Sequence, residues 1–76
     1  MLEKGQILEL ENSKNYFIYE MVELEDSKYL LLVNTTDEND IVFRKLVINA
    51  TGYYLESVEE ELLPTLASKF QELENN

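Results

Sequence analysis

Five short apolar segments separated by polar clusters constrain the fold of this 76-residue chain more than any other feature. Segments of this length are typical of β-strands, and the clusters between them are rich in Asn, Asp, Ser and Gly, which favour turns. The expected strands cover residues 6–10, 16–24, 29–33, 41–48 and 53–56. Because short turns join antiparallel neighbours, this order predicts an antiparallel β-meander of four to five strands.

The segment from Tyr29 to Val33 is apolar at every position instead of alternating. Such a run predicts a central strand that is covered on both sides, or one that is covered by a helix and faces a partner. In the segment from Tyr16 to Leu24 both faces begin with apolar residues, so periodicity leaves its inward face open. Arg44 and Lys45 interrupt the fourth segment and point to opposite faces of a strand. The residue on the covered face must extend its charged end to solvent or pair with a carboxylate, unless the two charges simply protect an edge strand.

A stripe of apolar residues at helical spacing predicts one C-terminal α-helix that packs on one face of the sheet, which gives an α+β fold. The members of this stripe are Leu62, Leu66, Phe70 and Leu73. Ser57 and Glu60 have the spacing of a capping box and favour a helix that begins at Val58. Pro64 is tolerated best at the first helical position, so the start of the helix stays open between Val58 and Pro64. We favour a start near Pro64.

The chain carries 16 Asp and Glu but only 6 Lys and Arg, which gives a net charge of −10. Residues 1–76 are expected to form a single small acidic domain. So much negative charge disfavours direct binding of nucleic acid and of anionic membranes, and it favours a basic protein partner. A signal peptide and an apolar run long enough to cross a bilayer are both absent, so we expect a cytoplasmic protein.

The chemical inventory argues against catalysis. With no His and no Cys, the usual general base and the strongest nucleophile are missing, so we expect no enzyme, no catalytic residues and no cofactor. The loop around Asp37, Glu38 and Asp40 has oxygen ligands that suit calcium. Its spacing does not match a calcium-binding loop, so a solvated loop without a metal site is the favoured interpretation.

Tyrosines provide the best argument for an interaction surface. Tyr is frequent at binding hot spots, and adjacent strand residues point to opposite faces. At least one ring of the pair Tyr53 and Tyr54, and one of Tyr16 and Phe17, should therefore be exposed if only one sheet face is covered. Glutamates at the expected helix start can add an acidic docking patch. The candidate partner-binding residues are Tyr16, Tyr19, Tyr53, Tyr54, Glu56, Glu59 and Glu60.

Several motifs follow the same order as in a known family. They are Tyr19–Leu24, Lys28–Val33 after an acidic turn, Asp37–Phe43, Gly52–Glu56 and Phe70–Leu73. With these motifs the chain resembles the YrzB-like family of small acidic bacterial proteins of unknown function. The resemblance implies a bacterial source and the strand order given above, and it implies no activity.

Two functions remain open from the sequence. The first is a non-enzymatic protein–protein interaction module, with an apolar patch of several hundred Å² on the open face of the sheet that binds a protein partner or a second copy in a homodimer. The alternative is an inhibitor that mimics nucleic acid and occupies a basic DNA- or RNA-binding groove. This alternative requires carboxylates gathered on one surface. The candidates are Glu20, Glu23, Glu25, Asp26, Asp37, Glu38, Asp40 and the acids of 56–61.

Overall fold

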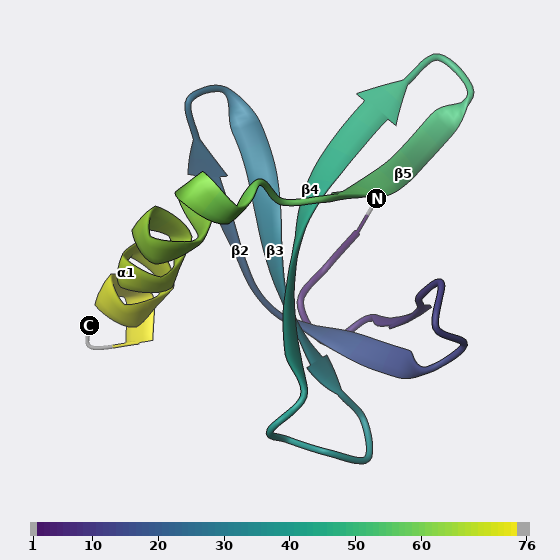
Figure 1. Ribbon diagram of the computed structural model, residues 1–76. Helices are drawn as coiled ribbons and strands as arrows, with labels where there is room; N and C mark the ends of the chain where they lie inside the picture. Colours follow the sequence, from purple (N-terminus) through teal and green to yellow (C-terminus); the bar gives the residue numbers. More distant parts are fainter. Residues whose placement is uncertain (1, 75–76) are drawn as a thin grey trace.

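The structure is a computed structural model, and it describes residues 2–74. Five antiparallel strands form one meander sheet in the order β1-β2-β3-β4-β5, followed by a C-terminal helix (Figure 1). This confirms the predicted α+β fold. The elements are β1 (Ile7–Glu9), β2 (Asn15–Leu24), β3 (Ser27–Asn34), β4 (Ile41–Asn49), β5 (Gly52–Ser57), the short 3₁₀ helix η1 (Glu60–Leu62) and α1 (Leu63–Glu74).

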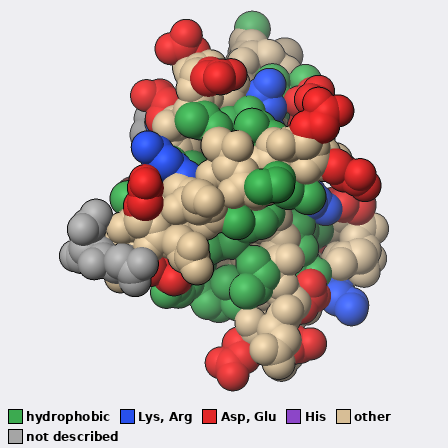
Figure 2. All heavy atoms as spheres, turned by 60° about the vertical axis from the view of Figure 1, so that its left-hand side comes forward, with side chains coloured by type: hydrophobic (Ala, Val, Ile, Leu, Met, Phe, Trp, Pro, Cys, Tyr) green, Lys and Arg blue, Asp and Glu red, His purple; other side chains and the backbone are tan. Residues whose placement is uncertain are grey.

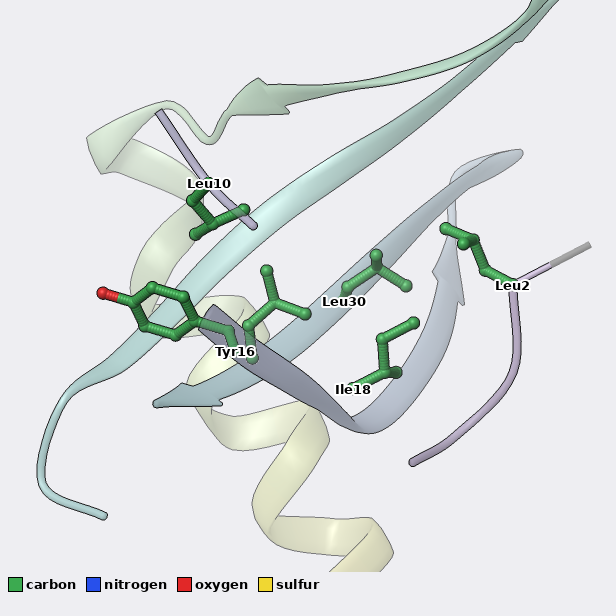
Figure 3. Packing of buried hydrophobic residues seen from close by; sticks show 6 residues of the cluster. Leu2, Leu10, Tyr16, Ile18 and Leu30 are labelled. Carbon is green, nitrogen blue, oxygen red and sulfur yellow. The ribbon is translucent and has the colours of Figure 1, made fainter. Parts of the chain in front are cut away.

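The sheet is bent so strongly that it covers one of its own faces. The pairing of β2 with β3 shifts between Ile18 and Glu20, which marks a β-bulge, and a bulge bends and twists the strand that carries it. Inside the bend lies a closed core of buried side chains (Figure 3). Its members are Leu2, Leu10, Tyr16, Ile18, Leu30 and Leu32. Over β2 and β3 the face opposite the helix is therefore closed, and our expectation of an open sheet face is wrong there; the far end of the β4–β5 hairpin leaves side chains of this face exposed.

The helix covers part of the other face. Leu66 and Phe70 of α1 are buried there against Tyr29 and Leu31 of β3. The Phe70 ring stacks on the ring of Phe43, with centroids 5.6 Å apart and an angle of 9° between the planes. Both sides of β3 are thus buried, as its continuous apolar run predicts. The predicted helical stripe is confirmed in its middle, while Leu73 at its end is exposed.

The start of the helix agrees with the position of Pro64 and not with the capping box. The α-helix begins at Leu63, so Pro64 lies in its first turn, where no N–H group is needed. Ser57 still belongs to β5, and the residue that precedes η1 is Glu59, whose side chain makes no capping hydrogen bond. The predicted capping box is wrong because β5 continues through Ser57.

Arg44 lies on the face that the bend closes, and it pairs with a carboxylate, as one of the two sequence interpretations allows. Its Nη2 donates to Oε1 of Glu11 at 2.6 Å, and its Nη1 donates to the carbonyl oxygen of Phe43 at 3.0 Å. A backbone hydrogen bond to Glu11 and the bond and charge of Arg44 lower the pKa of Glu11. Because β4 lies between β3 and β5, the interpretation of Arg44 and Lys45 as edge-strand protection is wrong.

Candidate interaction surface

Tyr16 belongs to the core, which corrects its expected place on an interaction surface. Only 1% of the residue is exposed. Its hydroxyl donates to Oδ2 of Asp40 at 2.6 Å and accepts a hydrogen bond from Nδ2 of Asn12 at 3.0 Å. Because both partners satisfy the phenol, the ring can be buried at little cost. The partner Asp40 lies 24 residues away, so nothing local in the sequence signals it.

The acidic loop between β3 and β4 has a structural explanation. The Asp40 carboxylate also accepts from Nδ2 of the buried Asn34 at 3.0 Å, and these bonds from Tyr16 and Asn34 lower its pKa. Oδ1 of Asp37 accepts from the backbone N–H of Asn39 at 3.0 Å. Across residues 2–74, no group of three or more potential His, Cys, Asp or Glu ligands is placed to hold a metal ion.

Tyr53 and Tyr54 of β5 are both exposed, to 49% and 47%. They point to opposite faces, and each pairs with an apolar residue of β4: Tyr53 with Ile48 and Tyr54 with Val47. The far end of this hairpin stands apart from the helix and from the β2–β3 hairpin (Figure 1). Ile48 is accordingly 69% exposed. The end of the hairpin therefore presents apolar side chains on both faces.

Glu56 and Glu59 are exposed and lie on a shallow hollow of about 310 Å³ between the end of β5 and the helix start. Glu25 and Glu61 line it as well, and Lys45 is the basic residue among its lining side chains. The floor includes Tyr29, Val58 and Leu62, which belong to the core beneath the helix. Glu60 is also exposed but does not line the hollow. The structure thus brings two of the three predicted glutamates together, beside a carboxylate from the β2–β3 turn.

A second exposed apolar feature escaped the sequence analysis. On the helix side of the sheet, one row of directly paired residues crosses four strands. This apolar row consists of Ile7, Phe17, Val33 and Ile41. Ile7 is 61% and Ile41 is 53% exposed, so the helix does not cover the ends of the row. Only the register of three strand pairs reveals this row, because its members are far apart in the sequence.

Tyr19 and Leu73 extend the apolar row toward the helix. The ring centroids of Tyr19 and Phe17 are 6.4 Å apart. A hydrogen bond to Glu74 and the negative charge of that carboxylate raise the pKa of Tyr19, so the last turn of α1 lies beside the Tyr19 hydroxyl. We call Ile7, Phe17, Tyr19, Ile41 and Leu73 the helix-side patch; Phe17 is half-buried and the other four are exposed. Figure 2 shows hydrophobic side chains gathered on the side of α1, with Asp and Glu around their margin.

The carboxylates that would imitate nucleic acid lie mainly at opposite ends of the sheet. Glu25 and Asp26 form the β2–β3 turn near the helix start, whereas Asp37 and Glu38 lie on the β3–β4 loop. From the first to the last of the eight residues of β3, seven steps of ~3.3 Å separate these ends by about 23 Å. Glu20 is paired with Lys4 at 3.1 Å. In the described residues this distribution gives two acidic ends instead of the single track that a mimic needs.

Comparison of the chain with models of protein families, with curated proteins and with solved structures gave no match. The resemblance to the YrzB-like family therefore stays a prediction. Within residues 2–74, no helix is both long enough and apolar enough to cross a bilayer.

Proposed function

We propose that this chain is a non-enzymatic protein–protein interaction module and that it binds its partner through the helix-side patch. The observation that carries the proposal is the in-register apolar row, whose ends Ile7 and Ile41 are more than half exposed. Exposed apolar side chains that lie side by side on the surface of a small domain are typical of a contact site. The lack of His and Cys supports a role by contact and not by catalysis.

The surroundings of the patch favour a basic partner. The net charge of −10 attracts a cationic protein over a distance, and acidic side chains border the hydrophobic area in Figure 2. The patch would form the apolar centre of an interface and the carboxylates its polar rim. Burial of the apolar centre contributes about 25 cal/mol per Å² to binding. Apolar contacts then set the dissociation rate, and charge sets the association rate.

The test is an affinity capture from the native host with three forms of the chain. The double variant Ile7→Ser/Ile41→Ser removes the apolar ends of the patch without changing the charge. The control Ile48→Ser removes an isoleucine that is at least as exposed, 69% against 61% and 53%, from the far end of the β4–β5 hairpin. Circular dichroism first establishes that all three are folded.

We expect the wild type and Ile48→Ser to capture the same protein, with less of it at high salt, and the double variant to lose it. Equal capture by all three folded proteins, or capture that depends only on Ile48, would contradict the proposed surface. Turnover of a small molecule by the purified chain would contradict the non-enzymatic role.

A further inference from the structure

The hollow between the end of β5 and the helix start contains a tyrosine hydroxyl without a partner. Tyr29 of β3 lies in its floor, and only 8% of the residue is exposed. Among residues 2–74 the Tyr29 hydroxyl makes no hydrogen bond, whereas the hydroxyl of the other buried tyrosine, Tyr16, makes two. The Tyr29 oxygen keeps contact with solvent, because the described residues have no unpartnered polar side-chain atom that is fully buried. The floor of the hollow therefore offers one hydrogen-bonding group to a ligand.

The rim of the hollow is strongly negative. Four carboxylates line it against one ammonium group, so three negative charges are in excess. The ammonium is that of Lys45, which lies directly opposite Glu56 on the neighbouring strand. The ion pairs within residues 2–74 are Lys4–Glu20 and Arg44–Glu11, so no direct contact neutralises the four carboxylates. They belong to Glu25, Glu56, Glu59 and Glu61. The hollow therefore attracts a cation.

The spacing of the carboxylates selects a large, flat cation. No three of them converge closely enough to hold a metal ion within the described part of the chain. A guanidinium group presents five N–H donors in one plane, so it can bridge carboxylates that a metal ion cannot reach together and still donate to the Tyr29 oxygen. It is also more weakly hydrated than an ammonium group, so it loses less on moving onto an apolar floor.

The apolar floor and the size of the hollow suit a single arginine side chain. Val58 and Leu62 lie in the floor beside Tyr29, and arginine packs its methylene groups along such a surface while its charged end stays near water. The volume of about 310 Å³ is at the lower end for ligand sites, which leaves room for one side chain and not for a large molecule.

We propose that this hollow binds the guanidinium group of an arginine side chain that a protein partner supplies. The carboxylates of the rim and the Tyr29 hydroxyl accept its hydrogen bonds. The site is separate from the helix-side patch, and only the protein source of the arginine rests on the proposed function.

The test is an NMR titration of the full chain at low salt with N-acetyl-arginine amide, whose blocked ends imitate an arginine inside a polypeptide. We expect saturable shifts of the backbone amides of residues 25–29 and 56–62. N-acetyl-citrulline amide has the same shape without the charge and should give no saturable shift, and N-acetyl-lysine amide should bind more weakly. Equal binding of the lysine probe, or shifts spread over every acidic segment of the chain, would overturn the guanidinium site.

Three variants locate the site. Tyr29→Phe keeps the ring and removes the hydroxyl, so it should weaken binding of the arginine probe by about 2- to 10-fold. Glu59→Gln/Glu61→Gln should abolish the saturable shifts. Asp37→Asn/Glu38→Gln changes the net charge by the same amount on the β3–β4 loop, and it should bind like the wild type. Equal weakening by the two double variants would show that the probe responds to overall charge and not to the hollow.

The titration and the capture experiment fail independently of each other. Without saturable shifts the guanidinium site is refuted, whereas the helix-side patch still stands if Ile7→Ser/Ile41→Ser loses the captured protein. Saturable shifts at the hollow, in turn, establish the site even if that variant captures the same protein as the wild type.

Discussion

The β2–β3 and β4–β5 hairpins consist of similar apolar and aromatic residues, but they are covered to very different extents. Leu30 and Leu32 of β3 are fully buried, with the bent sheet on one side and α1 on the other side of the strand. Ile48 and Tyr53 of the second hairpin are largely exposed. The composition of a strand therefore does not decide its burial. Position in the fold decides it, because Leu30 and Leu32 lie inside the bend of the sheet, whereas the far end of the β4–β5 hairpin stands apart from the helix and from the β2–β3 hairpin (Figure 1).

The largest expected effect comes from truncating equivalent side chains in the two hairpins. Leu30→Ala leaves a cavity in the closed core and should lower the free energy of unfolding by about 2–5 kcal/mol. For a domain of this size that is a large part of the total stability. Ile48→Ala should change it by less than about 0.5 kcal/mol. Urea unfolding of both variants at low protein concentration measures the difference, and similar losses would mean that the hairpin is packed against something in the monomer.

The turns of the two hairpins allow a second comparison. Glu25 and Asp26 form a two-residue turn with φ of 50° and 67°, a conformation that glycine adopts more readily. Gly52, the first residue of β5 after the other turn, has φ of 142°. Gly52→Ala should destabilise the chain by roughly 1 kcal/mol or more, because alanine is strained at this positive φ. A steric clash does not contribute, since open space surrounds the added methyl group. Asp26→Gly should instead be neutral or stabilise the chain by about 0.5 kcal/mol.

Thermal unfolding of these two variants and of Gly5→Ala checks the assignment. Gly5 also has a positive φ, of 90°, and open space around it, but it lies before the first strand. A Gly52→Ala variant as stable as the wild type would show that the β4–β5 turn relaxes without cost.

Most of the fold could be predicted from the sequence because its signals are local. The five apolar segments, the turns between them and the helical stripe each lie within a dozen residues, and all five strands and the helix occur where expected. Pro64 indicated the start of α1 correctly. The bend of the sheet could not be predicted, since the bulge after Ile18 has no glycine or other marker in the sequence.

The candidate surface was predictable only in part, for the same reason. The exposure of one ring of Tyr53 and Tyr54 was expected, because neighbours on a strand point to opposite faces. The exposure of both rings was not expected, and it arises because the end of their hairpin stands apart from the rest of the fold (Figure 1). The burial of Tyr16 depends on Asp40, which is distant in sequence. The helix-side patch depends on three strand registers at once. A change of one position in any of them would move Ile7 or Ile41 to the other face.

The hydroxyl of Tyr16 distinguishes a structural tyrosine from the tyrosines of the exposed hairpin. Tyr16→Phe leaves the ring in place but removes the bond to Asp40 and leaves Asn12 without its acceptor. We expect a loss of about 1 kcal/mol in the free energy of unfolding. Tyr53→Phe, on the exposed hairpin, should cost nothing measurable. Urea unfolding near neutral pH measures both, and equal stabilities of the two variants would show that the Tyr16 bond is no better than a bond to water.

The smallest effect expected is a change of stability with pH. It arises at Asp40, the partner of Tyr16, and has no counterpart on the β4–β5 hairpin. Bonds from Tyr16 and Asn34 lower the pKa of Asp40 below its ordinary value of 3.8. A group with a lowered folded-state pKa contributes its full stability above the unfolded-state pKa and loses it as the pH falls through the folded-state pKa. The stability advantage of the wild type over Asp40→Asn should therefore be constant from neutral pH to about pH 5 and should shrink below about pH 4.

Tyr16→Phe provides the control, since without the Tyr16 bond the pKa of Asp40 moves back toward its ordinary value. The stability difference between Tyr16→Phe and Tyr16→Phe/Asp40→Asn should therefore depend less on pH. An advantage that stays the same down to the lowest pH at which the chain is folded would show that the bonds do not distinguish the charged from the neutral carboxyl, and the buried phenol would then be held by packing alone.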